Sequence, residues 1–79
     1  MNPEDMLMKL KLQNIAMQLT DFAEQAKDRA VQLQADMDEG RYGSSSALLN
    51  AQIELDKEIS RAKGFGEAAR FVVHESMKI

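Results

Sequence analysis

The amino-acid sequence predicts an all-α protein: an antiparallel two-helix hairpin that is completed by dimerisation or by a partner chain. Two observations predict this fold. Apolar residues recur at steps of three and four along both halves of the chain, which is the spacing of one face of an α-helix. The two halves are separated by one segment rich in glycine and serine, residues 40–46, and such segments mark turns. The 79 residues therefore form a single helical-hairpin domain.

The first helix is expected over residues 3–39, approximately. Asn2 is a favourable N-cap residue, and Pro3 suits the first helical position because its missing N–H would have no partner there. Gly40 is a natural residue to follow the helix because it tolerates a positive φ. The apolar stripe of this helix consists of Leu12, Ile15, Leu19, Phe22, Ala26, Ala30, Leu33 and Met37.

Two features of the first helix need an explanation. Residues 8–12 alternate between apolar and basic side chains like a short strand, but helical patterns flank them on both sides and favour a helix. Asp36, Asp38 and Glu39 lie at the C-terminal end of the helix, where the helix dipole disfavours negative charge. We expect either fraying of this end or a contact with Arg41.

The turn is expected at about residues 40–45 and the second helix at about residues 46–77. Any of the serines 44–46 can cap this helix. Its stripe consists of Leu48, Leu55, Ile59, Ala62, Phe65, Ala69, Val72 or Val73, and Met77. Gly64 and Gly66 interrupt the pattern, and each disfavours a helix by about 1 kcal/mol relative to alanine. They mark either a bend or fray point, or a place where another backbone approaches closely beside Phe65.

Composition narrows the possible environments and partners. The chain contains no cysteine, and small secreted domains usually depend on disulfides, so we expect a cytoplasmic protein. No apolar stretch approaches the length that crosses a bilayer, and the N-terminal residues are acidic rather than basic as in a signal peptide. The net charge is −3, and no basic stripe is present to replace the counterions of a nucleic acid. We therefore expect neither membrane insertion nor nucleic-acid binding.

The apolar surface exceeds what two helices can bury against each other. Within the hairpin, Leu12, Ile15, Leu19 and Phe22 are expected to pack against Phe65, Ala69, Val72 and Val73. The N-terminal residues Met6, Leu7, Met8 and Leu10 surround much of the first helix, and exposed apolar surface of this kind marks association sites. Methionine is adaptable and common on surfaces that bind helices. The predicted partner-binding residues are Met6, Leu7, Met8, Leu10 and Phe65.

The sequence contains no recognisable catalytic or cofactor-binding apparatus. His74 is the only histidine, and Glu67 and Glu75 beside it do not form a known metal-binding motif. The three consecutive serines lack a positioned base, which nucleophilic catalysis requires. We therefore expect a protein that is not an enzyme and that has no catalytic residues, no cofactor and no metal ligands.

The length, acidity and central glycine turn, with residues 33–40 leading into Ala47-Leu48-Leu49, resemble the YscE/EscE-like co-chaperones of bacterial type III secretion systems. This resemblance covers the whole chain as architecture and rests on no short motif. It implies a hairpin that pairs with a tetratricopeptide-like chaperone to keep a needle subunit soluble until export. The alternative from another class is a structural homo-oligomer, a dimeric helical bundle that serves as a phage or bacterial assembly component.

Overall fold

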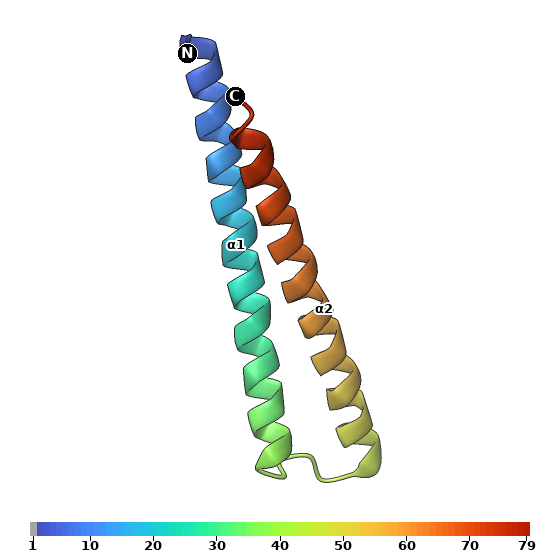
Figure 1. The fold of residues 1–79 in the computed structure, drawn as a ribbon. Helices are drawn as coiled ribbons and strands as arrows, with labels where there is room; N and C mark the ends of the chain where they lie inside the picture. Colours follow the sequence, from blue (N-terminus) through green and yellow to red (C-terminus); the bar gives the residue numbers. More distant parts are fainter. Residues whose placement is uncertain (1) are drawn as a thin grey trace.

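A computed structural model describes residues 2–79 of the chain as two long helices joined by a short turn (Figure 1). Helix α1 spans Pro3–Asp38 and helix α2 spans Ser45–Ser76. The two helices lie side by side and run antiparallel, and the hairpin measures 61 × 13 × 12 Å along its principal axes. The predicted all-α hairpin is confirmed.

Helix α1 begins and ends at the residues that the sequence indicates. The Asp5 N–H donates to Asn2 Oδ1 at 2.8 Å, so Asn2 is the N-cap and Pro3 the first helical residue. At the other end Gly40 has a φ of +70°. Its N–H donates to the Met37 carbonyl and the Arg41 N–H donates to the Asp36 carbonyl, the pattern of a Schellman motif.

The acidic end of α1 is stabilised by Arg41. Its guanidinium Nε lies 2.7 Å from Glu39 Oε2 and 3.7 Å from Asp36 Oδ1. This cation offsets the negative charge that gathers at the C-terminal end of the helix dipole. Of the two expectations, the contact with Arg41 is therefore the one that the structure shows.

Helix α2 begins at a serine cap and continues past both internal glycines. Ser44 Oγ accepts a hydrogen bond from the Ala47 N–H at 3.1 Å, which makes Ser44 the N-cap. The helix is unbroken through Gly64 and Gly66. Residues 8–12 of α1 are helical as well, which confirms the helical interpretation of that alternating segment.

The register of the hairpin is fixed by two contacts across it. The ring centroids of Phe22 and Phe65 are 5.5 Å apart, and Arg29 Nε lies 2.9 Å from Glu58 Oε2. Seven residues forward along α1 thus correspond to seven residues back along α2. By this count each α1 residue faces one α2 residue. We describe two residues that face each other in this way as lying at the same level. The repeat of seven is that of a coiled coil.

The contact between the helices, which we call the seam, follows strict alternating steps of four and three. Its members are buried or half-buried: Leu12, Ala16, Leu19, Ala23, Ala26, Ala30, Leu33 and Met37 on α1, and Ala51, Leu55, Glu58, Ala62, Phe65, Ala69, Val72 and Ser76 on α2.

This seam corrects the predicted packing. Ile15 was expected between the helices but is 45% exposed, and Phe22 touches Phe65 yet is 47% exposed. On α2, Ile59, Val73 and Met77 are exposed as well. Their places are taken mainly by small residues, because two long helices stay in contact only if the repeat of seven is kept throughout. Large apolar residues outside that repeat are left on the flanks.

Candidate protein-binding surface

The N-terminal end of α1 extends beyond α2. If the register of Phe22 and Phe65 is continued by fourteen residues, Met8 lies at the level of Ile79. Helix α2 already ends at Ser76. Figure 1 shows the first turns of α1 projecting past the other helix. We call residues 3–10 the N-terminal extension.

The side chains of this extension are arranged to contact something other than α2. The positions that continue the seam toward the N-terminus hold Asp5 and Lys9, which are polar. The apolar residues lie at the other positions around the helix, and all four are between 52% and 58% exposed: Met6, Leu7, Met8 and Leu10. Because α2 would cover only the seam positions, these four residues form an apolar surface that the hairpin itself leaves uncovered.

Phe65, the fifth predicted partner-binding residue, lies elsewhere. It is a half-buried member of the seam and its ring is tilted by 43° against that of Phe22. The structure therefore brings Met6, Leu7, Met8 and Leu10 together on the extension and places Phe65 far along the hairpin. Phe65 contributes to packing between the helices, with only part of its surface open to a partner.

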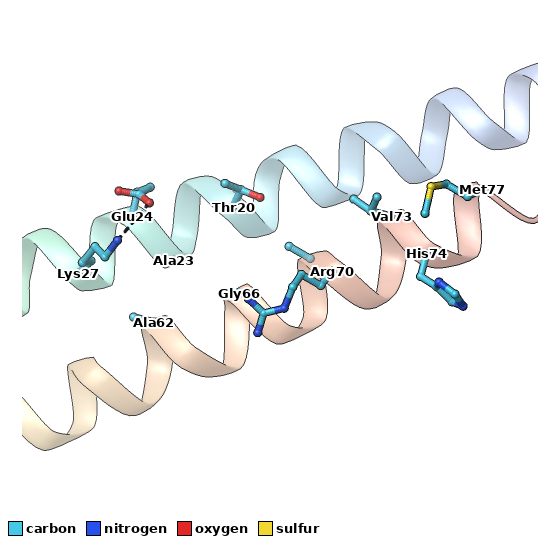
Figure 2. Close-up of a pocket in the computed structure, with 11 residues that line it drawn as sticks. Thr20, Ala23, Glu24, Lys27, Ala62, Gly66, Arg70, Val73, His74 and Met77 are labelled. Atoms are coloured by element: carbon cyan, nitrogen blue, oxygen red, sulfur yellow. Dashed lines mark ion pairs between the residues drawn. The ribbon is translucent and has the colours of Figure 1, made fainter.

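A shallow groove runs along one flank of the hairpin between the helices. It consists of two adjoining hollows of about 590 and 640 Å³ that share Thr20, Val73 and Met77. Its floor contains the small residues Ala16, Ala23, Ala62, Gly66 and Ala69. Figure 2 shows the part between Lys27 and Met77. Small side chains on the floor leave room for larger side chains of another helix.

The two margins of this groove differ in charge. On α1 the margin includes Asp21 and Glu24, and Glu24 lies 3.8 Å from Lys27. On α2 the margin includes Arg70 and His74, whose side chains point away from α1 in Figure 2. Lys63 precedes Arg70 by seven residues and so lies on the same face of α2. The α1 margin thus carries both acidic and basic residues, because Lys27 and Lys9 also line the groove, and Glu24 lies at the level of Lys63 on α2.

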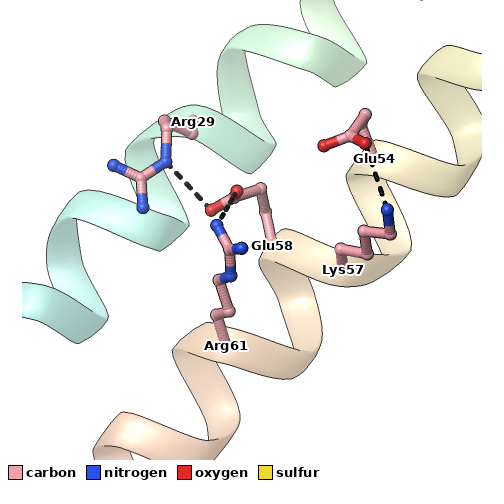
Figure 3. A network of polar contacts seen from close by, with 5 residues as sticks. All are labelled: Arg29, Glu54, Lys57, Glu58 and Arg61. Atoms are coloured by element: carbon pink, nitrogen blue, oxygen red, sulfur yellow. Dashed lines mark hydrogen bonds and ion pairs between the residues drawn. The ribbon is translucent and has the colours of Figure 1, made fainter.

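One charged residue lies within the seam itself. The side chain of Glu58 is 7% exposed, and its carboxylate accepts from Arg29 Nε at 2.9 Å and from Arg61 at 3.0 Å. Figure 3 shows the two guanidinium groups converging on it from α1 and α2. Glu54 and Lys57 form a separate exposed pair one turn away. Across residues 2–79, every buried side-chain nitrogen or oxygen atom has a hydrogen-bond partner.

Sequence reasoning missed the groove because it searched for large apolar residues. The groove floor is made of alanine and glycine, which add little to an apolar stripe. The signal in the sequence is the repetition of small residues at intervals of seven: Ala16, Ala23 and Ala30 on α1, and Ala62, Ala69 and Ser76 on α2. Such a repeat marks a seam where the helices meet with little side-chain bulk between them.

The described residues present two surfaces open to contact, the N-terminal extension and the groove. Within residues 2–79, no group of three or more His, Cys, Asp or Glu side chains is placed to hold a metal ion. Neither described helix contains a segment long and apolar enough to span a membrane. No family model matches the sequence, and neither the curated proteins nor the solved structures include a match to it.

Proposed function

We propose that this chain is a non-enzymatic protein-interaction module whose N-terminal extension binds a helix of another protein. The observation that carries the proposal is the inverted pattern of the extension: polar residues at the seam positions Asp5 and Lys9, and apolar residues around them. A helix with apolar residues at several faces is stable in water only when neighbouring helices cover it.

The more specific form of the proposal is a cytoplasmic co-chaperone. The chain resembles the small hairpin co-chaperones of type III secretion, which together with a tetratricopeptide-like chaperone keep a needle subunit soluble. An exposed apolar extension next to a stable hairpin supports such a role, because it provides a helix that a concave helical repeat can enclose. In this view Met6, Leu7, Met8 and Leu10 contact the chaperone or its cargo.

The alternative is a structural homo-oligomer, and the groove between the helices favours it. In that case copies of the chain would assemble into a helical bundle with no other protein. Purification of the chain from its native host distinguishes the co-chaperone from the homo-oligomer, because different proteins should purify with it in the two cases. A helical-repeat chaperone or a needle subunit at near one-to-one stoichiometry supports the co-chaperone, and a stable homodimer alone supports the homo-oligomer.

The binding surface is tested by charged substitutions in the extension. We expect Leu7→Glu and Leu10→Glu to weaken binding of the co-purified partner at least about tenfold, as truncation of central interface residues does. Because both side chains are more than half exposed, the helical circular dichroism should be retained and the free energy of unfolding should change by about 0.5 kcal/mol or less.

The matched control is Ile53→Glu, which places the same charge at an apolar residue that is also about half exposed, on the outer side of α2. This variant should bind the partner normally. Loss of helicity in Leu7→Glu or Leu10→Glu would show that these residues belong to the core of the hairpin, and equal weakening by all three variants would show that the extension is not the specific contact.

A further inference from the structure

The groove has a feature that points to its occupant: charged residues of opposite sign lie at matching levels on its two margins. Along α1 the margin carries Asp21, Glu24 and Lys27. Along α2 it carries Arg70, and Lys63 and Asp56 precede Arg70 at intervals of seven on the same face. In the register set by Phe22 and Phe65, Glu24 lies at the level of Lys63, and Asp21 lies at a level between Lys63 and Arg70. None of the ion pairs within residues 2–79 joins these two margins across the groove.

We propose that this groove binds a second copy of the chain, related by a two-fold axis parallel to the helices, to form a four-helix bundle. Such an axis keeps every residue at its own level and places α1 of one copy over α2 of the other. Glu24 of each copy then faces Lys63 of the other, so the contact is made twice, as expected for an isologous dimer.

The remaining groove residues fit this arrangement. Met17, Val73 and Met77 stand exposed at the edge of a floor of alanine and glycine, so the large side chains of one copy can enter the hollows of the other. Lys27 lies at the level of Ser60, and Asp56 of the other copy lies one turn away from that level. An arrangement that stacks α1 on α1 about an axis of the same direction would instead place Glu24 against Glu24 and Lys27 against Lys27, and like charges placed against each other oppose association.

The inference does not rest on the proposed partner function. The charged residues of the dimer contact, Glu24 and Lys63, lie at the middle of the hairpin, and Leu7 lies on the extension beyond the end of α2. A variant can therefore lose self-association and still bind a heterologous partner, or the reverse. Failure of one proposal is distinguishable from failure of the other.

The test uses charge reversal in the full chain. Glu24→Lys and Lys63→Glu each turn both copies of the contact into like-charge pairs, and we expect each to raise the dissociation constant of the dimer at least about tenfold. An equimolar mixture of the two variants forms heterodimers in which both contacts join opposite charges. Sedimentation equilibrium of the mixture should therefore return the dissociation constant to within about threefold of the wild type.

The control is Lys57→Glu, which reverses an exposed lysine that is paired with Glu54 outside the groove; it should leave the dissociation constant unchanged. A wild-type chain that stays monomeric at the highest soluble concentration overturns the proposal. Single variants that associate like the wild type, or a mixture that does not recover, overturn the assigned arrangement of the two copies.

Cross-linking gives a second measurement that does not depend on charge. The chain has no cysteine, so Glu24→Cys and Lys63→Cys each introduce one thiol. On mild oxidation an equimolar mixture of these two variants should form a disulfide-linked pair of unlike chains, while neither variant alone should cross-link efficiently. Efficient cross-linking of Glu24→Cys with itself would place α1 against α1 and contradict the proposal.

Discussion

At the residue scale, Glu58 is the position that departs most from an ordinary hydrophobic seam. Its carboxylate is almost fully covered, yet both of its partners are more than half exposed: the side chains of Arg29 and Arg61 are 52% and 59% exposed. Removing the carboxylate would therefore leave two arginines in water rather than an isolated buried charge. This limits the cost of its loss compared with a fully buried ion pair.

We expect Glu58→Ala to lower the free energy of unfolding by about 1–2 kcal/mol, because two charge-assisted hydrogen bonds are lost and a void opens in the seam. Glu58→Leu should be as stable as the wild type or more stable, since a leucine fills the position and leaves no unpaired charge. Denaturant titration measures both. The control Glu54→Ala removes only an exposed pair and should change the free energy by about 0.5 kcal/mol or less.

Glu58 also favours one register. A leucine at this position would pack equally well wherever the repeat of seven is kept, whereas the carboxylate gains its contact from α1 only when Arg29 faces it. A shift by one heptad would remove that contact. If Glu58→Leu proved less stable than Glu58→Ala, the interpretation of the position as a replaceable ion pair would be wrong.

At the scale of the helices, the sequence predicted the ends and most of the seam, and it was wrong at Ile15 and Phe22 on α1. Asn2, Pro3 and Gly40 carry local signals whose meaning depends on few neighbours, and the structure confirms them. Whether Ile15 or Ala16 faces the other helix depends instead on residues along the whole length of both helices. Both fit a helical step from Leu12, and only the repeat of seven maintained along both helices selects alanine. Ranking residues by size favours Ile15 and Phe22, which therefore appeared in the predicted core.

The two internal glycines of α2 allow a matched pair of substitutions. Both lie within continuous helix, and a Cβ added at either one meets no atom within 4 Å. Gly64→Ala and Gly66→Ala should each raise the free energy of unfolding of the isolated chain by about 0.5–1 kcal/mol, the difference in helix propensity. Thermal melts at low concentration measure this. A loss of stability in either variant would show that the helix does not continue through that position.

The same pair separates folding from association. Gly66 lies on the floor of the groove, and Gly64 does not line it. If a second copy occupies the groove, the methyl group of Gly66→Ala takes up space at the contact and weakens the dimer, while Gly64→Ala leaves it unchanged. An equal dissociation constant for the two variants would argue against close approach of another chain at Gly66. Comparing the two variants therefore tests whether another backbone approaches closely at these glycines, which is one of the two interpretations that the sequence leaves open.

At the scale of the whole molecule, the hairpin is thin for its length. It is 61 Å long but only 12–13 Å across, and no large side chain among residues 2–79 is fully buried. The most buried apolar residues are alanines: Ala16, Ala26, Ala30, Ala51 and Ala69. Burial of apolar surface drives folding roughly in proportion to area, so a seam of alanines contributes little. The need for a further chain stays a prediction, and the surfaces that would bind such a chain are defined only by the register of the two helices.

A chain whose apolar surface is covered by association should become more heat-stable as its concentration rises, because binding of a second copy stabilises only the folded state. For dimer unfolding of a chain of this length, the midpoint temperature should increase by about 5 °C for each tenfold rise in concentration. Melting curves followed by circular dichroism over about a hundredfold range of concentration test this. Glu24→Lys provides the control: it should melt at a lower temperature than the wild type at each concentration. A wild-type midpoint that is the same at every concentration would mean that the alanine seam alone holds the hairpin together, and that neither the groove nor the extension is needed for folding.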